Sequence, residues 1–260
     1  MTVPDWQLPA GVTRGAWDYF QARHIARDYD QYFADCPLFD VDSRLLARYF
    51  SPPGVVADFG CGTGRALLPL IHRGHTGLAI DLSEEMLAVV AEKAAAEQLP
   101  VRCVRGNLVE LPHVSDNAAD YGMCLFSTLG MIQGRENRQR ALLEMRRILR
   151  PGGILILHVH NVWFNLYDPA GPGWVLGSWL RSCGKGDYEF GDKVFPYRQI
   201  PAMFLHVFPR REILSTVRQA GLQIIEFIPL GAPGYQPLRW GYFLQELRAS
   251  GWLIVCQKSV

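Results

Sequence analysis

The chain has almost no excess of charge of either sign. Its 26 Lys and Arg residues stand against 25 Asp and Glu residues, which leaves a net charge of +1 over 260 residues. A protein that is drawn to nucleic acid or to an acidic membrane surface by its overall charge needs a strong positive balance. The composition therefore disfavours a nucleic-acid partner and gives no general attraction to a membrane.

Cysteine motifs and long apolar runs are also missing. The six cysteines are scattered, with no C-x-x-C pair and no Cys/His cluster at zinc-site spacing. No stretch reaches the ~18 apolar residues needed to span a bilayer. The first residues lack the basic start and apolar run of a secretion signal. We therefore expect a cytoplasmic protein in a reducing compartment, with no structural metal and no membrane segment.

The most informative pattern is a glycine loop after a short apolar run. Residues 55–59 read as a strand with Asp58 near its end, and a G-x-G-x-G sequence follows at Gly60, Gly62 and Gly64. A strand that leads into such a loop and then a helix presents backbone N–H groups to a ligand. A dinucleotide fingerprint needs G-x-G-x-x-G, but Arg65 stands where its third glycine would be. A nicotinamide oxidoreductase is therefore the least favoured function.

Further strands follow the loop in a regular order. Gly77–Asp81 reads as the second strand, and an Asp about 20 residues beyond a glycine loop is placed to accept hydrogen bonds from ribose hydroxyls. Ser83 is a good N-cap for the helix that follows. Three more strands are predicted over residues 101–108, 120–129 and 149–157, and the last includes an R-P-G-G turn. This alternation over residues 55–160 predicts parallel βαβ units.

In order and spacing, these motifs resemble those of the class I S-adenosylmethionine-dependent methyltransferases, in their small-molecule group. The resemblance covers about half of the chain. It implies an α/β fold with a doubly wound, seven-stranded, mostly parallel Rossmann-like sheet, whose last strand is antiparallel and lies beside strand five. It also implies S-adenosylmethionine as the cofactor and assigns the cofactor contacts to Tyr29, Asp58, Gly60, Cys61, Gly62, Gly64, Asp81, Leu82, Met86, Asn107, Leu108 and Phe126.

Within that set the resemblance gives different parts of the cofactor to different residues. Asp58 is implied to face the methionine end, over which Tyr29 closes, and Asp81 to hold the ribose. The residues implied to line the adenine and its ribose are Leu82, Met86, Asn107 and Leu108. Each residue also has a purely structural alternative, such as a helix cap for Asp81 or core packing for Met86.

The pattern divides the single domain expected over residues 1–260 into four parts. Residues 1–50 form a helical cap rich in aromatic residues, and residues 51–160 form the cofactor-binding core. Residues 161–208 have no clear period and many aromatic side chains, which predicts a lid over the acceptor. Residues 209–260 complete the sheet, after a strand expected at residues 204–208.

Methyl transfer from S-adenosylmethionine is an in-line displacement, so the protein need not supply a covalent nucleophile. The strand-four region lacks the Asn/Asp-Pro-Pro run, the Pro-Cys pair and the paired glutamates that are typical of nucleobase-amine, cytosine-carbon and arginine methyltransferases. We therefore expect a small, partly apolar or aromatic acceptor. The arginines of residues 135–150 fit a solvated helix face better than an RNA site.

Two histidines are candidate general bases, because His titrates near neutral pH. His160 ends the fifth strand, on the same side as His158, at the edge where an acceptor would lie. His206 precedes the last helix, and its H-x-F sequence resembles a group of tRNA wobble-uridine methyltransferases. That activity and a non-catalytic S-adenosylmethionine-binding protein remain the alternatives. The sequence leaves open the acceptor, the atom methylated and the oligomeric state.

Overall fold

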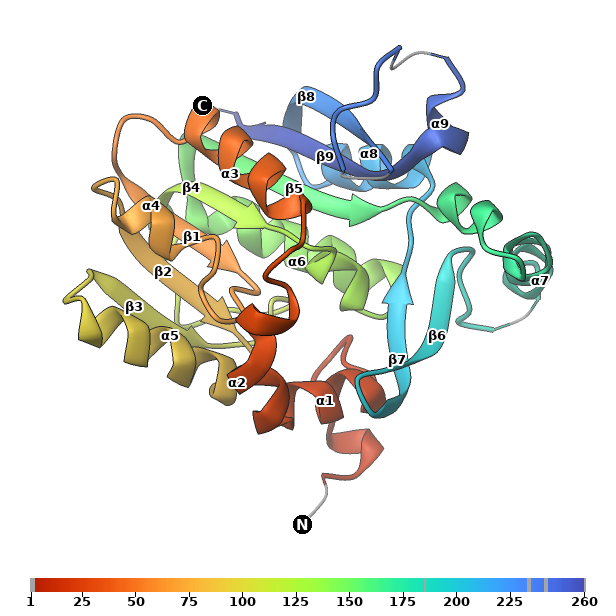
Figure 1. The fold of residues 1–260 in the computed structure, drawn as a ribbon, viewed down its shortest axis with the longest axis horizontal. Helices are drawn as coiled ribbons and strands as arrows, with labels where there is room; N and C mark the ends of the chain where they lie inside the picture. The colour runs from red at the N-terminus through yellow and green to blue at the C-terminus, as the bar shows by residue number, and fades with distance from the viewer. Residues whose placement is uncertain (1–2, 185, 233–234, 241–242, 260) are drawn as a thin grey trace.

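The computed structural model describes residues 3–184, 186–232, 235–240 and 243–259. Its main sheet has seven strands in the order β3-β2-β1-β4-β5-β9-β8 (Figure 1). Strands β1 to β5 run parallel, and β9 is antiparallel to both β5 and β8. The expected doubly wound sheet is confirmed, with its antiparallel last strand beside β5. The strands are β1 (Val55–Phe59), β2 (Thr76–Asp81), β3 (Val101–Arg105), β4 (Ala119–Cys124), β5 (Leu149–His160), β8 (Leu222–Gly231) and β9 (Ala249–Lys258).

Helices cover both faces of this sheet. Consecutive side chains of a strand point to opposite faces, and here both sets are apolar, so both faces must be covered. Phe59 and Ile80 belong to the core on the face covered by α6 and α8. Val56 and Ala79, on the other side of the same strands, belong to the core on the face covered by α3, α4 and α5. The bounds are α3 (Leu38–Tyr49), α4 (Leu68–Ile71), α5 (Glu84–Ala96), α6 (Arg135–Ile148) and α8 (Arg210–Gln219).

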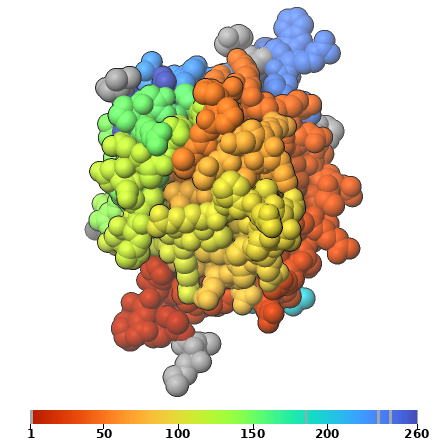
Figure 2. Space-filling model, turned by 90° about the vertical axis from the view of Figure 1, so that its left-hand side faces the viewer, coloured from red at the N-terminus to blue at the C-terminus, as the bar shows by residue number. Residues whose placement is uncertain are grey.

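Helix α5 begins where its sequence predicts. The Ser83 side chain accepts a hydrogen bond from the Met86 backbone N–H at 3.3 Å, and Glu84 and Glu85 lie in the first turn, where the helix dipole favours acids. Figure 2 shows this side of the molecule, where the gold and yellow side chains of α5 and β3 cover the edge of the sheet above the red N-terminal residues.

A second, two-stranded antiparallel sheet lies beyond the main one, between β6 (Asp192–Tyr197) and β7 (Ile200–His206). The strand expected at residues 204–208 is therefore wrong in its start and its end. It begins at Ile200 and pairs with β6. The strand ends at His206. The Val207 N–H donates to the carbonyl of Gly191, which precedes β6, and the Phe208 N–H donates to the carbonyl of His160 at the end of β5.

The N-terminal helices α1 (Arg14–Gln21) and α2 (Arg23–Tyr32) lie beside this hairpin, and α1 packs on β7 (Figure 1). The remaining elements are η1 (Asp5–Gln7), η2 (Thr128–Met131), η3 (Val162–Tyr167), α7 (Gly171–Ser182) and α9 (Gln245–Arg248). Within the described ranges, no helix combines the length and apolar character needed to cross a membrane. The same residues contain no His, Cys, Asp and Glu grouping suited to a metal ion.

Candidate cofactor and acceptor site

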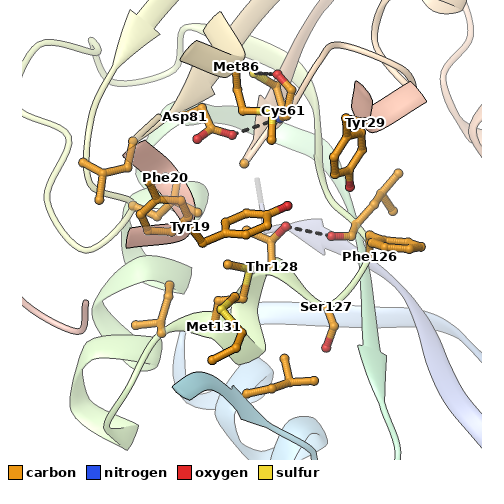
Figure 3. Close-up of a pocket in the computed structure, with 18 of the residues that line it drawn as sticks. Tyr19, Phe20, Tyr29, Cys61, Asp81, Met86, Phe126, Ser127, Thr128 and Met131 are labelled. Carbon is orange, nitrogen blue, oxygen red and sulfur yellow. Dashed lines mark hydrogen bonds between the residues drawn. The ribbon is translucent and has the colours of Figure 1, made fainter. Parts of the chain in front are cut away.

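A cavity of about 370 Å³ lies at the carboxyl ends of β1, β2 and β4 (Figure 3). Its volume is at the lower end of the range for ligand sites. Residues of α1, α2 and the β6–β7 hairpin complete its wall. Twelve of the fourteen residues expected from the sequence line it: Tyr29, Asp58, Gly60, Cys61, Gly62, Asp81, Leu82, Met86, Asn107, Leu108, Phe126 and His160. Gly64 and His206 are not among the lining residues.

The glycine loop opens its backbone to the cavity at Gly62. This residue has a φ of 52°, which disfavours most side chains, and a Cβ atom built on it would meet no atom within 4 Å. Gly64 faces away, because a Cβ atom there would lie 3.2 Å from the side chain of Val90 in α5. Gly64 therefore lets the loop pack on α5, and the structure gives it no direct place in the site.

Asp81, at the end of β2, is held in place by the loop it faces. Its carboxylate, which Figure 3 shows at the cavity, accepts hydrogen bonds from the backbone N–H groups of Gly62 at 2.9 Å and Ser83 at 2.8 Å. Burial raises the pKa of Asp81, while these backbone donors oppose the rise. The carboxylate is thus oriented toward the cavity before any ligand arrives, and it also links the glycine loop to the start of α5.

Asp58 lies at the floor of the cavity in a cluster of buried charges. Burial raises its pKa to about 8, although the neighbouring Arg65 opposes the rise. Arg65 also lies 3.7 Å from a carboxylate oxygen of Asp42 in α3 and stacks on Phe39, 3.1 Å from the ring centre. In the sequence, Arg65 serves only as evidence against a dinucleotide fingerprint, and Asp42 is not singled out. The contact between Arg65 and Asp42 could not be predicted, because it depends on how α3 packs on the sheet.

Tyr29 points its hydroxyl into the cavity from α2 (Figure 3). The next residue, Asp30, fixes this helix to the glycine loop. Its carboxylate accepts a hydrogen bond from the Thr63 hydroxyl at 2.5 Å and pairs with Lys93 of α5. The Lys93 ammonium also donates to the Thr63 carbonyl at 3.0 Å. The sequence placed Tyr29 at the site, and the structure adds the contacts that hold it there.

The end of β4 differs from the sequence prediction. The strand expected over residues 120–129 stops at Cys124, because Phe126 and Ser127 both have left-handed backbones, with φ values of 54° and 63°. This turn brings the Phe126 ring edge-on to Phe33 of the N-terminal segment, with 5.0 Å between ring centres. It also places the Ser127 hydroxyl 3.3 Å from the backbone nitrogen of His160.

The adenine edge assigned to Asn107 is only partly free for a ligand. The Asn107 amide donates to the Ala10 carbonyl at 2.9 Å, and its oxygen accepts from the Val109 N–H at 3.2 Å. Asn107 therefore ties the N-terminal segment to the loop after β3, while Leu108 beside it is buried. The backbone of this loop remains on the cavity wall.

The two candidate bases have different surroundings. His160 lines the cavity at the end of β5, where burial lowers its pKa to about 4 and Lys193 adds to the effect, so it is neutral at neutral pH. His158 lies behind it, edge-on at 5.4 Å and fully buried, and neither of its ring nitrogens has a partner in the part of the chain that the structure describes.

His206, by contrast, is held between two acids away from the cavity. Its Nδ1 lies 2.7 Å from a carboxylate oxygen of Asp192, and its Nε2 lies 2.9 Å from one of Glu212. Burial lowers the pKa of His206, but these hydrogen bonds outweigh burial and raise it above its usual value. His206 does not line the cavity, and both of its ring nitrogens are engaged in joining β6, β7 and α8.

Comparisons with known proteins bear on the same part of the chain. Residues 56–153 match a family model described as a methyltransferase domain. The chain is 29% identical over 175 residues to "Probable methyltransferase ltbC" of Aspergillus luteorubrus, covering 63% of this chain and 59% of that protein. It is 39% identical over 113 residues to malonyl-[acyl-carrier protein] O-methyltransferase of Pectobacterium atrosepticum, covering 43% and 41%. The chain spans about half the length of the curated relatives it matches.

Solved structures share the fold. The 1,6-didemethyltoxoflavin-N1-methyltransferase of Burkholderia thailandensis superposes with a TM-score of 0.62 at 17% identity, covering 97% of this chain and 94% of that one. Its structure holds 1,6-didemethyltoxoflavin and S-adenosylhomocysteine. Residues 56–153 therefore match a methyltransferase domain, and the order of the strands is that of the expected Rossmann-like methyltransferase fold.

Proposed function

We propose that the chain transfers a methyl group from S-adenosylmethionine to a small, partly apolar acceptor bound in the cavity. The observation that carries the proposal is the preset Asp81 carboxylate beside the open backbone of Gly62, under a wall rich in aromatic side chains. The Burkholderia neighbour binds a small acceptor within the same fold, which agrees with a cavity of this kind.

The residues present fit the cofactor. Asp81 offers carboxylate oxygens that suit the two ribose hydroxyls, and Asp58 offers the site a negative charge once it ionises, which suits the cationic methionine end. Tyr29 covers that end from α2. When bound, S-adenosylmethionine supplies a methyl group whose carbon–sulfur bond breaks with both electrons left on sulfur, while the acceptor forms the new bond to carbon and loses a proton.

The chain's own contribution is to hold and enclose the reacting groups. The α1 helix and the β6–β7 hairpin form one wall of the cavity, and with a ligand bound they would limit the access of water, which favours a displacement that needs close approach. His160 is the side chain placed to receive a proton from the acceptor, because it lines the cavity in its neutral form. His158 supports it from behind within β5.

The observation that favoured a tRNA methyltransferase has another explanation in the structure. It is the H-x-F sequence of His206 and Phe208, but both side chains are fully buried and their rings pack edge-on at 4.6 Å. The sequence is thus explained by packing. A binding protein without turnover remains an alternative, and an experiment separates it from the enzyme.

Calorimetric titration tests the proposal, with S-adenosylmethionine and S-adenosylhomocysteine as ligands and NAD as the control. We expect one molecule of either sulfur compound per chain and no binding of NAD. Binding of NAD with neither sulfur compound would contradict the cofactor assignment. Formation of S-adenosylhomocysteine in the presence of candidate acceptors, followed by mass spectrometry, then separates turnover from binding alone.

A further inference from the structure

The two sides of the cavity differ in charge. Among the lining residues of the described chain, the side chains that are carboxylic acids or carry a guanidinium group are Asp58, Arg65 and Asp81, all from β1, the glycine loop and β2. Asp58, whose pKa burial raises to about 8, bears its charge only above that pH. The opposite wall comes from α1, η2, the end of β5 and the β6–β7 hairpin. Its apolar lining residues include Phe20, Met131, Phe195, Met203, Phe204 and Leu205. His160 on this wall is neutral.

This second wall also carries phenol groups without a protein partner. Tyr19 of α1 and Tyr197 of β6 have ring centres 6.1 Å apart, although they come from distant parts of the chain. Neither hydroxyl makes a hydrogen bond to any residue that the structure describes, and that of Tyr19 points into the cavity (Figure 3). Burial raises the pKa of both phenols, so both remain donors at neutral pH.

Tyr19 and Tyr197 are partly buried and line the cavity, so a ligand bound there would cover hydroxyls that have no partner in the described chain. A tyrosine hydroxyl that is covered without a hydrogen-bond partner is unfavourable. Two such groups side by side on an apolar wall point to a ligand that brings its own oxygen atoms. Arg198 opposes the rise in the pKa of both phenols, and Lys193 adds to the effect of burial on the pKa of His160, but neither residue lines the cavity. A carboxylate or an ammonium group on this wall would therefore lose its water without a lining side chain of opposite charge to contact. Flat aromatic walls favour a flat ligand.

We propose that the acceptor is an uncharged, flat molecule with a ring hydroxyl, a phenol or an enol, which Tyr19 and Tyr197 hold and which is methylated on oxygen. This inference rests on the proposed function and narrows its substrate class. It adds Tyr19 and Tyr197 as residues that determine specificity, which the sequence did not single out.

The low pKa of His160 favours an acceptor whose hydroxyl group is acidic. A weakly basic imidazole removes a proton efficiently only from a group that releases it readily, so phenols and enols suit it better than aliphatic alcohols. The hydroxyl oxygen forms the bond to the methyl carbon with one of its electron pairs, and sulfur keeps the pair of the bond that breaks. The hydroxyl proton goes to a ring nitrogen of His160 and from there to water.

Binding of three matched probes to the protein saturated with S-adenosylhomocysteine tests the inference. Naphthol is uncharged and has a ring hydroxyl, naphthoate carries a negative charge, and naphthylmethylammonium carries a positive charge. By calorimetry we expect naphthol to bind at least about tenfold more tightly than either ion, the order expected when a charge is buried without a partner.

Conservative variants assign the specificity to the two phenols. Tyr19→Phe and Tyr197→Phe should each weaken naphthol binding about two- to tenfold, the effect of one neutral hydrogen bond, and leave the affinity for S-adenosylhomocysteine unchanged. Tyr167→Phe is the matched control, because Tyr167 is 65% exposed and lies outside the cavity. It should change neither affinity.

The outcomes separate this inference from the proposed function. If S-adenosylhomocysteine does not bind, the proposed function itself fails. If it binds but an ionic probe is preferred, naphthol fails to bind at millimolar concentration, or both Phe variants bind naphthol as the parent does, the uncharged ring hydroxyl is the wrong acceptor class while the cofactor assignment stands.

Discussion

The backbone of Gly15 in α1 lies so close to Ala202 in β7 that a Cβ atom on residue 15 would be 1.9 Å from the Ala202 carbonyl oxygen. This contact joins the N-terminal helices to the hairpin above the cavity. A second contact lies at the hairpin tip, where Arg198 pairs with Asp28 and stacks on Tyr32, 4.3 Å from its ring centre. The cover of the cavity is thus made from two segments that are distant in sequence.

The first prediction concerns this cover. Gly15→Ala should force α1 away from β7 and lower the free energy of unfolding by about 1–3 kcal/mol, the usual effect of overpacking. Amide exchange of residues 14–21 and 200–206 should become faster, and naphthol should bind more weakly to the protein loaded with S-adenosylhomocysteine. Denaturant unfolding and exchange measured by mass spectrometry check both effects.

Gly177→Ala provides the control for that experiment. Gly177 lies within helix α7, and a Cβ atom there would meet nothing within 4 Å. Alanine in a helix interior is favoured over glycine by about 0.5–1 kcal/mol, so this variant should be slightly more stable. If Gly15→Ala behaves like Gly177→Ala in exchange and binding, the contact with Ala202 does not close the cavity.

The second prediction concerns Asp81. Asp81→Asn should weaken the binding of S-adenosylhomocysteine by about 1–3 kcal/mol, the range for losing a charged hydrogen-bond partner. The free energy of unfolding should fall by no more than about 1–3 kcal/mol, because the amide oxygen keeps one of the two backbone hydrogen bonds, from Gly62 or Ser83, and the other N–H loses its acceptor. Asp168→Asn, at an exposed position outside the cavity, is the control. A large loss of stability with normal binding by the folded remainder would make Asp81 a structural cap only.

Much of the site was predictable because it depends on local sequence. The glycine loop, the acid at the end of β2 and the Ser83 cap each lie within a short segment, and parallel strands bring their carboxyl ends to one edge. The β6–β7 hairpin was not predictable, because residues 161–208 have no apolar period to mark its strands. The stop of β4 depends on two left-handed residues, Phe126 and Ser127, which are not glycines.

The histidines also show that local sequence does not reveal contacts made by tertiary packing. His160 and His206 each follow an apolar strand segment near its carboxyl end, so the local pattern treats them alike. What separates them is the presence of Asp192 and Glu212 around His206, and those contacts arise only when β6 and α8 pack against β7. Similarly, the contact of Arg65 with Asp42 depends on the position of α3 on the sheet.

The third prediction is a pH dependence set by Asp58. Its pKa of about 8 in the folded protein lies above the ordinary value of 3.8, because burial disfavours the charge. Between these values the folded state binds more protons than the unfolded chain, so the free energy of unfolding falls as pH rises. Asp58→Asn has no group that titrates at this position, so its free energy of unfolding should not fall with pH for this reason. Its gain in melting temperature over the parent should therefore grow from about pH 5 to about pH 9.

The same group predicts how cofactor binding depends on pH. A positively charged ligand favours the ionised form of Asp58, so the affinity for S-adenosylmethionine should rise with pH and level off above about pH 8. S-adenosylhomocysteine lacks the sulfonium charge and should show a smaller rise. Calorimetry at several pH values measures both slopes. Equal slopes, or a slope that persists in Asp58→Asn, would place the titrating group elsewhere.

The fourth prediction separates the two histidines by stability and binding. The acids around His206 raise its pKa above 6.5, so its contribution to stability is complete below that pH and is lost as pH rises through the higher folded value. His206→Gln should therefore lower the free energy of unfolding by about 1–3 kcal/mol near pH 6, the range for losing charged hydrogen bonds, and by less at alkaline pH.

His160→Gln should give the opposite pattern. Its imidazole faces the cavity and is neutral at neutral pH, so the free energy of unfolding near pH 6 should stay within about 1 kcal/mol of the parent, because no ion pair is lost. Naphthol binding to the protein loaded with S-adenosylhomocysteine should weaken about two- to tenfold, as expected for one hydrogen bond. If His160→Gln unfolds the protein while His206→Gln leaves stability unchanged and abolishes naphthol binding, His206 is the residue that contacts the acceptor and His160 is the structural one.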